Sequence, residues 1–221
     1  MTTDLRCVEA VPSEAEEFSR FLSDIFRRTY AHGYSTDRLE RHIARYHGAP
    51  RLRAELETPT RWTLRVAERG RWRAFVTVGH AAPAPDAIDA ERPAQIERFY
   101  VETEAQGTGL AQRVLDAAVE RAAAEGHDAL WLAVWQHNAR AKRFYEKVGF
   151  MHVGTHPFEF DGVAELDKAA AASSFCDPPS FVNLKRRLLA HVGAVEWRWR
   201  DARDMGPSSF AYFISLLPDP Y

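Results

Sequence analysis

The chain has 221 residues, of which 46% are hydrophobic and 27% charged, and its formal net charge is −2. This length is enough to bury a full core, and it allows one domain with an appendage. Because charges of both signs are mixed along the chain, no basic segment would attract nucleic acid or a membrane surface, and neither is expected as a partner.

The first residues, the length of the apolar runs and the two cysteines predict a cytoplasmic protein. Residues 1–6 lack the basic and then apolar organisation of a signal peptide, and no apolar run approaches the roughly 18 residues that a bilayer span needs. Cys7 and Cys176 form neither a metal-binding spacing nor a disulfide framework. We therefore expect free thiols and no metal.

The first 80 residues predict a strand, three helices and a hairpin. A strand is expected at residues 5–11, followed by a helix to about residue 28 that places Phe18, Leu22 and Ile25 on one apolar stripe. Two more helices are expected at residues 36–46 and 50–56. Alternating apolar residues on both sides of a glycine turn predict a hairpin with strands at residues 62–67 and 72–80.

The remaining chain continues this alternation. After a proline-containing loop at residues 81–93, the predicted elements are strand 96–101, helix 111–123, strand 129–135, helix 138–148 and strand 151–160. Residues 129–135 are almost continuously apolar, which is typical of a strand buried on both faces. The last run with strand character is residues 210–217, and residues 164–207 would then be an insertion before the last strand.

A glycine-rich turn lies between strand 96–101 and the helix that follows. It reads Gln106, Gly107, Thr108, Gly109, Leu110 and Ala111. Such a turn presents backbone amides at a helix N-terminus, where a diphosphate is favoured. A Walker loop is excluded because no Gly-Lys-Ser/Thr is present, and a Rossmann turn would need a third glycine where Gln112 stands.

A second run, from Asn138 to Phe150, follows thirty residues later. In this order and at this spacing, the two runs resemble the acetyl-CoA motifs of the GCN5-related N-acetyltransferases (GNAT). The resemblance implies an α/β (α+β) fold, with a mixed, mostly antiparallel sheet and helices on both faces. We therefore expect an acetyltransferase core at residues 1–163, a helical insertion at 164–207, and the last strand and C-terminus at 208–221.

Within this family, the first 165 or so residues look closest to the bacterial spermidine/spermine N-acetyltransferases of the PaiA type. The segments behind this narrower resemblance are residues 26–34, 132–138 and 153–158. It implies a small-molecule, polyamine-like primary amine as the acceptor. Acetylation of a protein N-terminus or lysine stays open as an alternative.

The resemblance assigns residues to the cosubstrate acetyl-CoA. Residues Gln106 to Ala111 would bind the pyrophosphate, and the backbone of Phe99, Tyr100 and Val101 would bind the pantetheine arm. Asn138 stands in cap position for its helix and matches a family residue that contacts this arm. Lys147 is expected to reach a cofactor phosphate.

Two residues are expected to catalyse the transfer. Tyr145 lies on one helical face with Asn138, and in the family a tyrosine at this position protonates the leaving thiolate. An amine with a pKa near 10.4 must lose a proton before it attacks, and the resemblance implies Glu97 as the general base, because family members often place a base on this strand. Tyr30, His32 and Tyr34 follow the first helix and are weaker candidates for binding the acceptor.

Two other classes of function stay open at this point. One is an acetyl-CoA-binding module without turnover, against which Tyr145 and Glu97 argue. The other is a dinucleotide-dependent oxidoreductase, for which Asp128 lies at the right distance but before its strand instead of at its end.

The expected insertion carries an amphipathic helix. Leu188, Val192, Val195 and Trp199 share one helical face, which would pack on its own domain or on a second subunit. A homodimer is therefore a candidate assembly.

Overall fold

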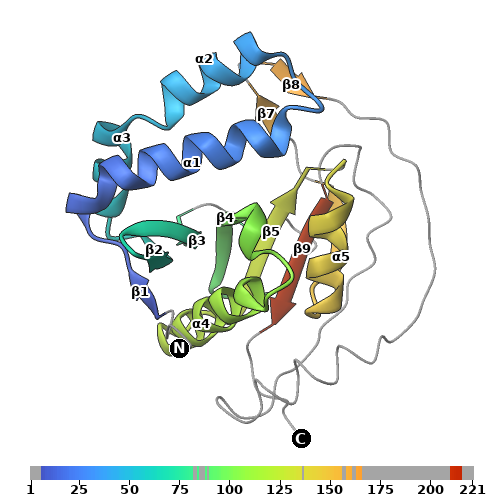
Figure 1. Ribbon diagram of the computed structural model, residues 1–221. Coiled ribbons are helices and arrows are strands. Elements are labelled where there is room, and N and C mark those ends of the chain that lie inside the picture. The colour runs from blue at the N-terminus through green and yellow to red at the C-terminus, as the bar shows by residue number, and fades with distance from the viewer. Residues whose placement is uncertain are drawn as a thin grey trace, which may run out of the picture. The chain divides into compact units, whose positions relative to one another are not determined.

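The computed structural model describes residues 6–81, 84, 88, 90–135, 137–155, 158–160, 163–165 and 210–215. Helices and strands alternate along these residues (Figure 1). Their order is β1 (Cys7–Glu9), η1 (Pro12–Glu14), α1 (Ala15–Tyr30), α2 (Thr36–Tyr46), α3 (Ala49–Leu56), β2 (Arg61–Glu68), β3 (Arg71–Gly79), β4 (Pro93–Val101), η2 (Thr103–Ala105), α4 (Leu110–Ala124), β5 (Ala129–Val134), α5 (Ala139–Lys147), β6 (Met151–Thr155), β7 (Phe158–Phe160), β8 (Val163–Glu165) and β9 (Phe210–Ser215).

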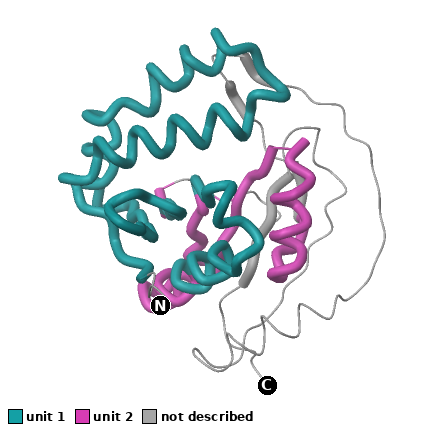
Figure 2. The backbone as a smooth tube through the Cα atoms, in the orientation of Figure 1, with its two compact units in different colours: residues 1–79, 97–118, 160–162 teal, residues 80–96, 119–159, 163–221 magenta. Residues whose placement is uncertain are grey.

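The chain divides into two compact units, shown in different colours in Figure 2. The first comprises residues 1–79, 97–118 and 160–162, and the second comprises residues 80–96, 119–159 and 163–221. Strand order is β1-β2-β3-β4 in the first unit and β4-β5-β9-β6 in the second, so β4 contributes residues to both. The predicted α/β class with a mostly antiparallel sheet is confirmed.

The hairpin of the first unit forms where the sequence predicts it. β2 and β3 pair antiparallel from Arg61↔Gly79 to Glu68↔Arg71. Arg69 and Gly70 connect them, with φ angles of 51° and 77°. Two successive positive φ angles suit the right-handed twist of the strands, which explains why a glycine stands in this turn.

Helix α1 covers one face of these strands, and α4 begins on the other face (Figure 1). Phe18 of α1 stacks on Trp72 with ring centroids 4.8 Å apart and meets the edge of Phe75 at 4.9 Å. Phe18 and Leu22 are each only 1% exposed. The predicted apolar stripe of this helix is therefore the core of the unit.

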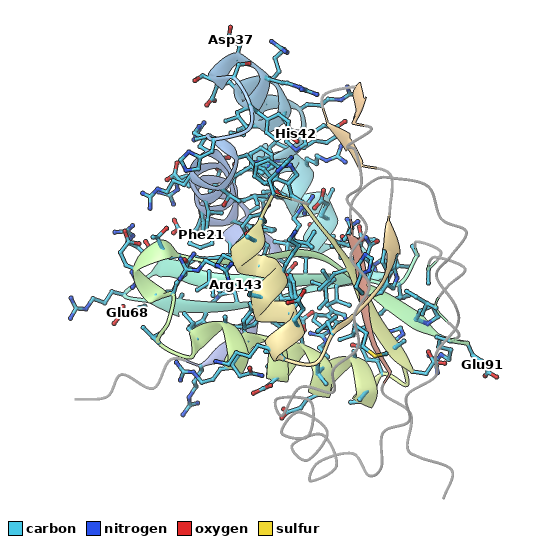
Figure 3. The ribbon with its side chains drawn as sticks, turned by 90° about the vertical axis from the view of Figure 1, so that its right-hand side faces the viewer. Phe21, Asp37, His42, Glu68, Glu91 and Arg143 are labelled. Carbon is cyan, nitrogen blue, oxygen red and sulfur yellow. The ribbon has the colours of Figure 1, made fainter. Side chains whose placement is uncertain are left out.

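Aromatic rings also join α1, α2 and the residues just before α3. His42 lies on α2 (Figure 3) and stacks on Phe26 at 4.8 Å, while His47 meets the edge of the same ring at 4.9 Å. His47 is 3% exposed, and Ser19 donates a hydrogen bond of 2.5 Å to its carbonyl. Burial disfavours the imidazolium and lowers the pKa of His47 to about 3, with help from the positive charge of Arg98.

The second unit is built on β5, whose residues are almost all buried, as the apolar run predicts. Residues 93–96 of β4 pair parallel with residues 129–132 of β5. β9 lies between β5 and β6 and pairs antiparallel with both, so the assignment of the last strand is confirmed, although it ends at Ser215.

One predicted strand was wrong in its extent. Residues 151–160 form two strands, β6 and β7, and β7 pairs with β8 in a separate two-stranded sheet. Between them the sequence places Pro157, which has no amide to donate to a ladder. Apart from β8, the expected insertion and its amphipathic helix lie outside the described residues, so the proposed domain boundaries stay predictions.

Candidate active site

The end of β4 carries the residues expected to bind the pantetheine arm. The pairing of β4 with β5 ends at Ile96↔Leu132, whereas β4 itself continues to Val101. The Tyr100 ring packs against Phe75, with centroids 5.7 Å apart. Thus Phe99, Tyr100 and Val101 lie in the part of β4 beyond its pairing with β5.

The glycine-rich turn connects this strand end with α4. Gly107 and Gly109 have φ angles of 83° and 86°, and a Cβ added to either would meet nothing within 4 Å. The left-handed backbone explains the glycines, and the space above them is open. Gly109 also begins the helix, since its carbonyl accepts a hydrogen bond of 3.1 Å from the Arg113 amide.

Side chains stabilise the shape of this turn. The Gln106 side-chain amide donates to the Val101 carbonyl at 3.0 Å, and the Thr108 hydroxyl donates to the Ala105 carbonyl at 2.7 Å. Leu110 anchors the start of α4 and is 2% exposed. Gln106 therefore joins the turn to the end of β4 in this structure, where the sequence suggested an amide aimed at a diphosphate.

The backbone amides of this turn are available to a ligand. Within the described part of the chain, the amides of residues 107–112 donate no hydrogen bond to another residue. Gly107, Thr108 and Gly109 are exposed. Unsatisfied amides at a helix N-terminus carry partial positive charge and suit a diphosphate.

Glu97 is held in an ion pair. Arg61 Nη2 donates to Glu97 Oε1 at 3.0 Å, and Arg61 Nε lies 2.7 Å from Oε2, close enough for an ion pair but without the alignment of a hydrogen bond. Both side chains are mostly shielded, with exposed fractions of 27% and 20%.

Glu55 of α3 extends this pair into a network. Its Oε2 lies 2.5 Å from Arg98 Nη1 and 3.8 Å from Arg61 Nη1. Burial by itself would raise the pKa of Glu55, but the hydrogen bond and charge of Arg98, with the charges of Arg61 and Arg51, hold this pKa below its ordinary value. The network holds the guanidinium groups of Arg61 and Arg98 in place.

The three expected acceptor-side residues have different surroundings. Tyr30 shares a side-chain hydrogen bond with Tyr100, and burial raises the pKa of the Tyr30 phenol while this bond partly offsets the rise. The Tyr34 ring lies 6.1 Å from that of Tyr30 and under the Arg38 guanidinium. His32 is exposed. The structure thus brings Tyr30 to Tyr100 of β4, with Tyr34 next to Tyr30.

In the second unit, α5 carries the other predicted residues. The Asn138 side chain accepts a hydrogen bond of 3.0 Å from the Ala141 amide, which confirms its capping role. Tyr145 is 7% exposed, and its ring lies between Phe144 and Phe150 with centroids 5.4 and 5.5 Å away. Lys147 ends the helix and is exposed.

Asp128, the acidic residue that the oxidoreductase alternative needs, has a structural role. Its carboxylate accepts hydrogen bonds from the backbone amides of Glu91 and Arg92, at 2.6 and 2.9 Å. The Glu91 side chain points outward (Figure 3). These bonds fix the turn before β4, and Asp128 itself is 6% exposed, so the alternative loses its ribose-binding group.

One pocket, of about 220 Å³, lies in the first unit between α1 and the start of β3. Phe21 and Trp72 line it together with charged residues of both signs, none of them a predicted site residue. Several of these charges are paired, as in the 2.7 Å contact of Arg20 with Glu17. We do not assign this pocket to the reaction, because acidic and basic side chains line it together and none of the predicted catalytic or binding residues does.

Sequence reasoning missed Arg61 and Gly79, which touch Glu97. A Cβ added to Gly79 would lie 2.3 Å from Glu97 Oε1. A hairpin register counted outward from Arg69 and Gly70 would pair Arg61 with position 78, whereas the irregularity between Val66 and Ala67 shifts its partner to Gly79.

The described residues contain no helix that could cross a membrane. In the same part of the chain, no group of three or more His, Cys, Asp or Glu residues could hold a metal ion.

Comparison with known proteins identifies a family. The profile of the Acetyltransferase (GNAT) family matches residues 19–150. An uncharacterised N-acetyltransferase of Lactobacillus delbrueckii subsp. lactis is 23% identical over 156 residues, which are 71% of this chain and 90% of that protein. An uncharacterised N-acetyltransferase of Mycobacterium tuberculosis is 35% identical over 77 residues, which are 35% of this chain and 49% of that protein.

A solved structure has a similar fold. The PaiA N-acetyltransferase of Thermoplasma acidophilum, determined in complex with coenzyme A, superimposes with a TM-score of 0.60 at 18% identity. The match covers 68% of this chain and 91% of that protein.

Proposed function

The chain belongs to the Acetyltransferase (GNAT) family and is an N-acetyltransferase, and on this premise we propose that it moves an acetyl group from acetyl-CoA directly to a primary amine of a small, polyamine-like molecule. The observation that carries the proposal is the turn at residues 106–111, with its two left-handed glycines and exposed amides at the start of α4. The polyamine-like acceptor is supported by the resemblance of residues 26–34, 132–138 and 153–158 to PaiA-type enzymes.

The turn fits the cosubstrate. Gly107, Thr108 and Gly109 leave open space for a diphosphate, and the amides up to Ala111 supply donors around it. Gln106 holds the turn to the strand end through the Val101 carbonyl. When bound, acetyl-CoA supplies the thioester whose acetyl group is transferred. We assign its pantetheine arm to the backbone of residues 99–101, with Asn138 and Lys147 as further contacts.

In the proposed reaction, Glu97 takes a proton from the acceptor ammonium, directly or through water. Removing that proton at pH 7 costs roughly 4 kcal/mol for an amine whose pKa is near 10.4. The amine nitrogen then attacks the acetyl carbonyl carbon, and the carbon–sulfur bond breaks. Tyr145 gives its phenolic proton to the departing thiolate, and the second proton, which the nitrogen releases as the amide forms, returns to the tyrosinate. We assign Tyr30, His32 and Tyr34 to the acceptor.

A thiol-release assay tests this function. The purified chain and acetyl-CoA are mixed with spermidine, spermine, amino acids and short peptides with free N-termini or lysines, and coenzyme A release is followed with a thiol reagent. Rapid release with the polyamines supports the proposal. N-Acetylated spermidine blocked at both primary amines is the matched control and should give only background.

The other outcomes identify the alternatives. Release with peptides alone would mean that the acceptor is a protein amine. Binding of acetyl-CoA by calorimetry without release for any amine would mean a non-catalytic binding module, and the proposed function would then be wrong.

A further inference from the structure

Arg61 and Gly79 together determine where the Glu97 carboxylate lies. Arg61 is the first residue of β2, Gly79 is the last residue of β3, and the two are register partners. Glu97 of β4 reaches past Gly79 to Arg61, with contacts of 3.0 Å from Nη2 to Oε1 and 2.7 Å from Nε to Oε2. Both carboxylate oxygens are thus engaged by one guanidinium.

Gly79 leaves the space that this contact needs. A Cβ at this position would lie 2.3 Å from Glu97 Oε1 and 2.9 Å from Cδ, so the end of the Glu97 side chain would have to shift. Its backbone does not need the left-handed region, since its φ lies outside that range. A glycine suits this position because the Glu97 carboxylate lies where a Cβ would be, and any larger residue would push Glu97 aside.

Arg61 is itself fixed from the other side. Its Nη1 lies 3.8 Å from Glu55 Oε2, and Glu55 also binds Arg98. The guanidinium is anchored by two carboxylates, and its planar geometry sets the plane of the Glu97 carboxylate. Without Arg61, the Glu97 side chain would be a largely shielded charge free to change rotamer.

We propose that Arg61 and Gly79 are positioning residues for acetyl transfer, holding the Glu97 carboxylate in the orientation in which it accepts the acceptor's proton. The inference rests on the proposed function. A misplacement of about 1 Å can cost on the order of 10²-fold in rate. Both residues contact the Glu97 side chain, through which they would act.

Double-mutant cycles test this coupling. Arg61→Met, Arg61→Lys and Gly79→Ala are each made alone and together with Glu97→Gln, and kcat and KM for the acceptor are measured at saturating acetyl-CoA. Arg61→Met and Gly79→Ala should each lower kcat by about 10- to 100-fold. Arg61→Lys should keep more activity than Arg61→Met, because the lysine ammonium can still pair with the Glu97 carboxylate. In the Glu97→Gln background, none of the three should cause a further loss.

Two matched controls separate positioning from general damage. Arg65 pairs with Glu14 at 2.6 Å on the same strand with similar shielding, so Arg65→Met removes a comparable ion pair without touching Glu97. Gly48→Ala adds a Cβ that meets only Pro50 Cδ, at 3.9 Å. Both should keep turnover near that of the unaltered chain, and acetyl-CoA affinity should be unchanged in every variant that keeps its melting temperature.

Each contrary result has its own meaning. Losses that add to that of Glu97→Gln would overturn the positioning role while leaving Glu97 as the base. Full activity in Glu97→Gln would overturn the inference together with the role of Glu97, but acetyl transfer would stand. No transfer to any amine by the unaltered chain would overturn the proposed function and this inference with it. If Arg61→Met does not fold, the cycles of Gly79→Ala and Arg61→Lys with Glu97→Gln test the positioning role.

Discussion

Two residues on α5 show that this helix has an exposed side and a buried side. Arg143 is exposed (Figure 3), whereas Tyr145, two positions later, is 7% exposed and lies between the rings of Phe144 and Phe150. Residues two apart on a helix point to nearly opposite sides. The phenol of Tyr145 is therefore held in a defined place, as a general acid must be.

Tyr145→Phe should lower turnover by about 10²-fold or more, because general acid catalysis contributes that much. Acetyl-CoA affinity should be nearly unchanged, since the ring and its packing are kept. The measurements are steady-state kinetics and calorimetry at neutral pH. Tyr46→Phe is the control, because Tyr46 lies under the guanidiniums of Arg45 and Arg51 and has no proposed role. Equal turnover in both variants would remove Tyr145 from the mechanism.

Gly109→Asp should weaken acetyl-CoA binding by about 100-fold or more, because a carboxylate beside a diphosphate costs a few kcal/mol in repulsion. A Cβ fits there, so the expected loss comes from charge and from the backbone φ of 86°. Gly70→Asp is the control, since Gly70 also has a positive φ, 77°, and open space, but lies in the hairpin turn. Unaltered affinity by calorimetry in Gly109→Asp would show that the loop is only a turn.

Glu97→Gln should flatten the rise of rate with pH between about 6 and 9, leaving only the dependence on the ionisation of the amine itself. The amide keeps the size of the side chain but cannot take the proton, and acetyl-CoA affinity should stay. The Glu97 carboxylate faces Arg61, and Glu55 and Arg98 lie beyond Arg61. Arg65→Met is the control, because it breaks an ion pair on the same strand without changing these four residues, and its pH profile should match that of the unaltered chain. An unchanged profile would exclude Glu97 as the base.

At the scale of the elements, the packing of α1, α2 and α3 depends on a neutral histidine. His47 is 3% exposed, and its Nδ1 has no hydrogen-bond partner among the described residues. Its pKa is lowered to about 3 in the folded chain, against an ordinary value of 6.5. Between these values the unfolded chain binds more protons than the folded one, so stability is present above pH 6.5 and falls as the pH decreases.

We therefore expect the free energy of unfolding to fall by on the order of 2 kcal/mol between pH 7 and about 4.5 on account of His47. In His47→Gln this part of the pH dependence should be absent, whatever the absolute stability of the variant. Urea unfolding at several pH values measures both. His32→Gln replaces an exposed histidine and should keep the original slope. Parallel slopes for His47→Gln and the unaltered chain would contradict the prediction.

At the scale of the whole molecule, β9 joins a distant part of the chain to the core. It pairs with β5 on one side and β6 on the other, whereas residues 166–207 before it carry none of the predicted catalytic groups. Since β8 ends at Glu165, the expected insertion can be removed after this residue. We therefore expect the second unit to fold without residues 166–207 but not without β9.

Replacing residues 166–207 by a short glycine–serine linker should preserve acetyl-CoA binding while changing acceptor affinity or subunit association. Calorimetry, acceptor kinetics and sedimentation measure the three properties. The control is truncation after residue 165, which also removes β9 and should unfold the second unit, because β5 and β6 both lose a partner. If the linker variant stays folded but no longer binds acetyl-CoA, the insertion belongs to the acetyl-CoA site.

The sequence by itself determined what depends on neighbours within a few residues. The apolar stripe of α1, the hairpin turn at Arg69 and Gly70, and the Asn138 cap follow from local periodicity, turn geometry and bonds three residues apart. The glycine turn before α4 belongs here too, because a left-handed backbone requires particular residue types.

Only the tertiary structure decided contacts between distant segments. The place of β9 between β5 and β6 could not be known, since a strand pattern shows that a strand exists but not its partners. The pairing of Arg61 with Glu97 joins residues 36 positions apart. It depends on hairpin register and on the space above Gly79, and both arise only once three strands lie side by side.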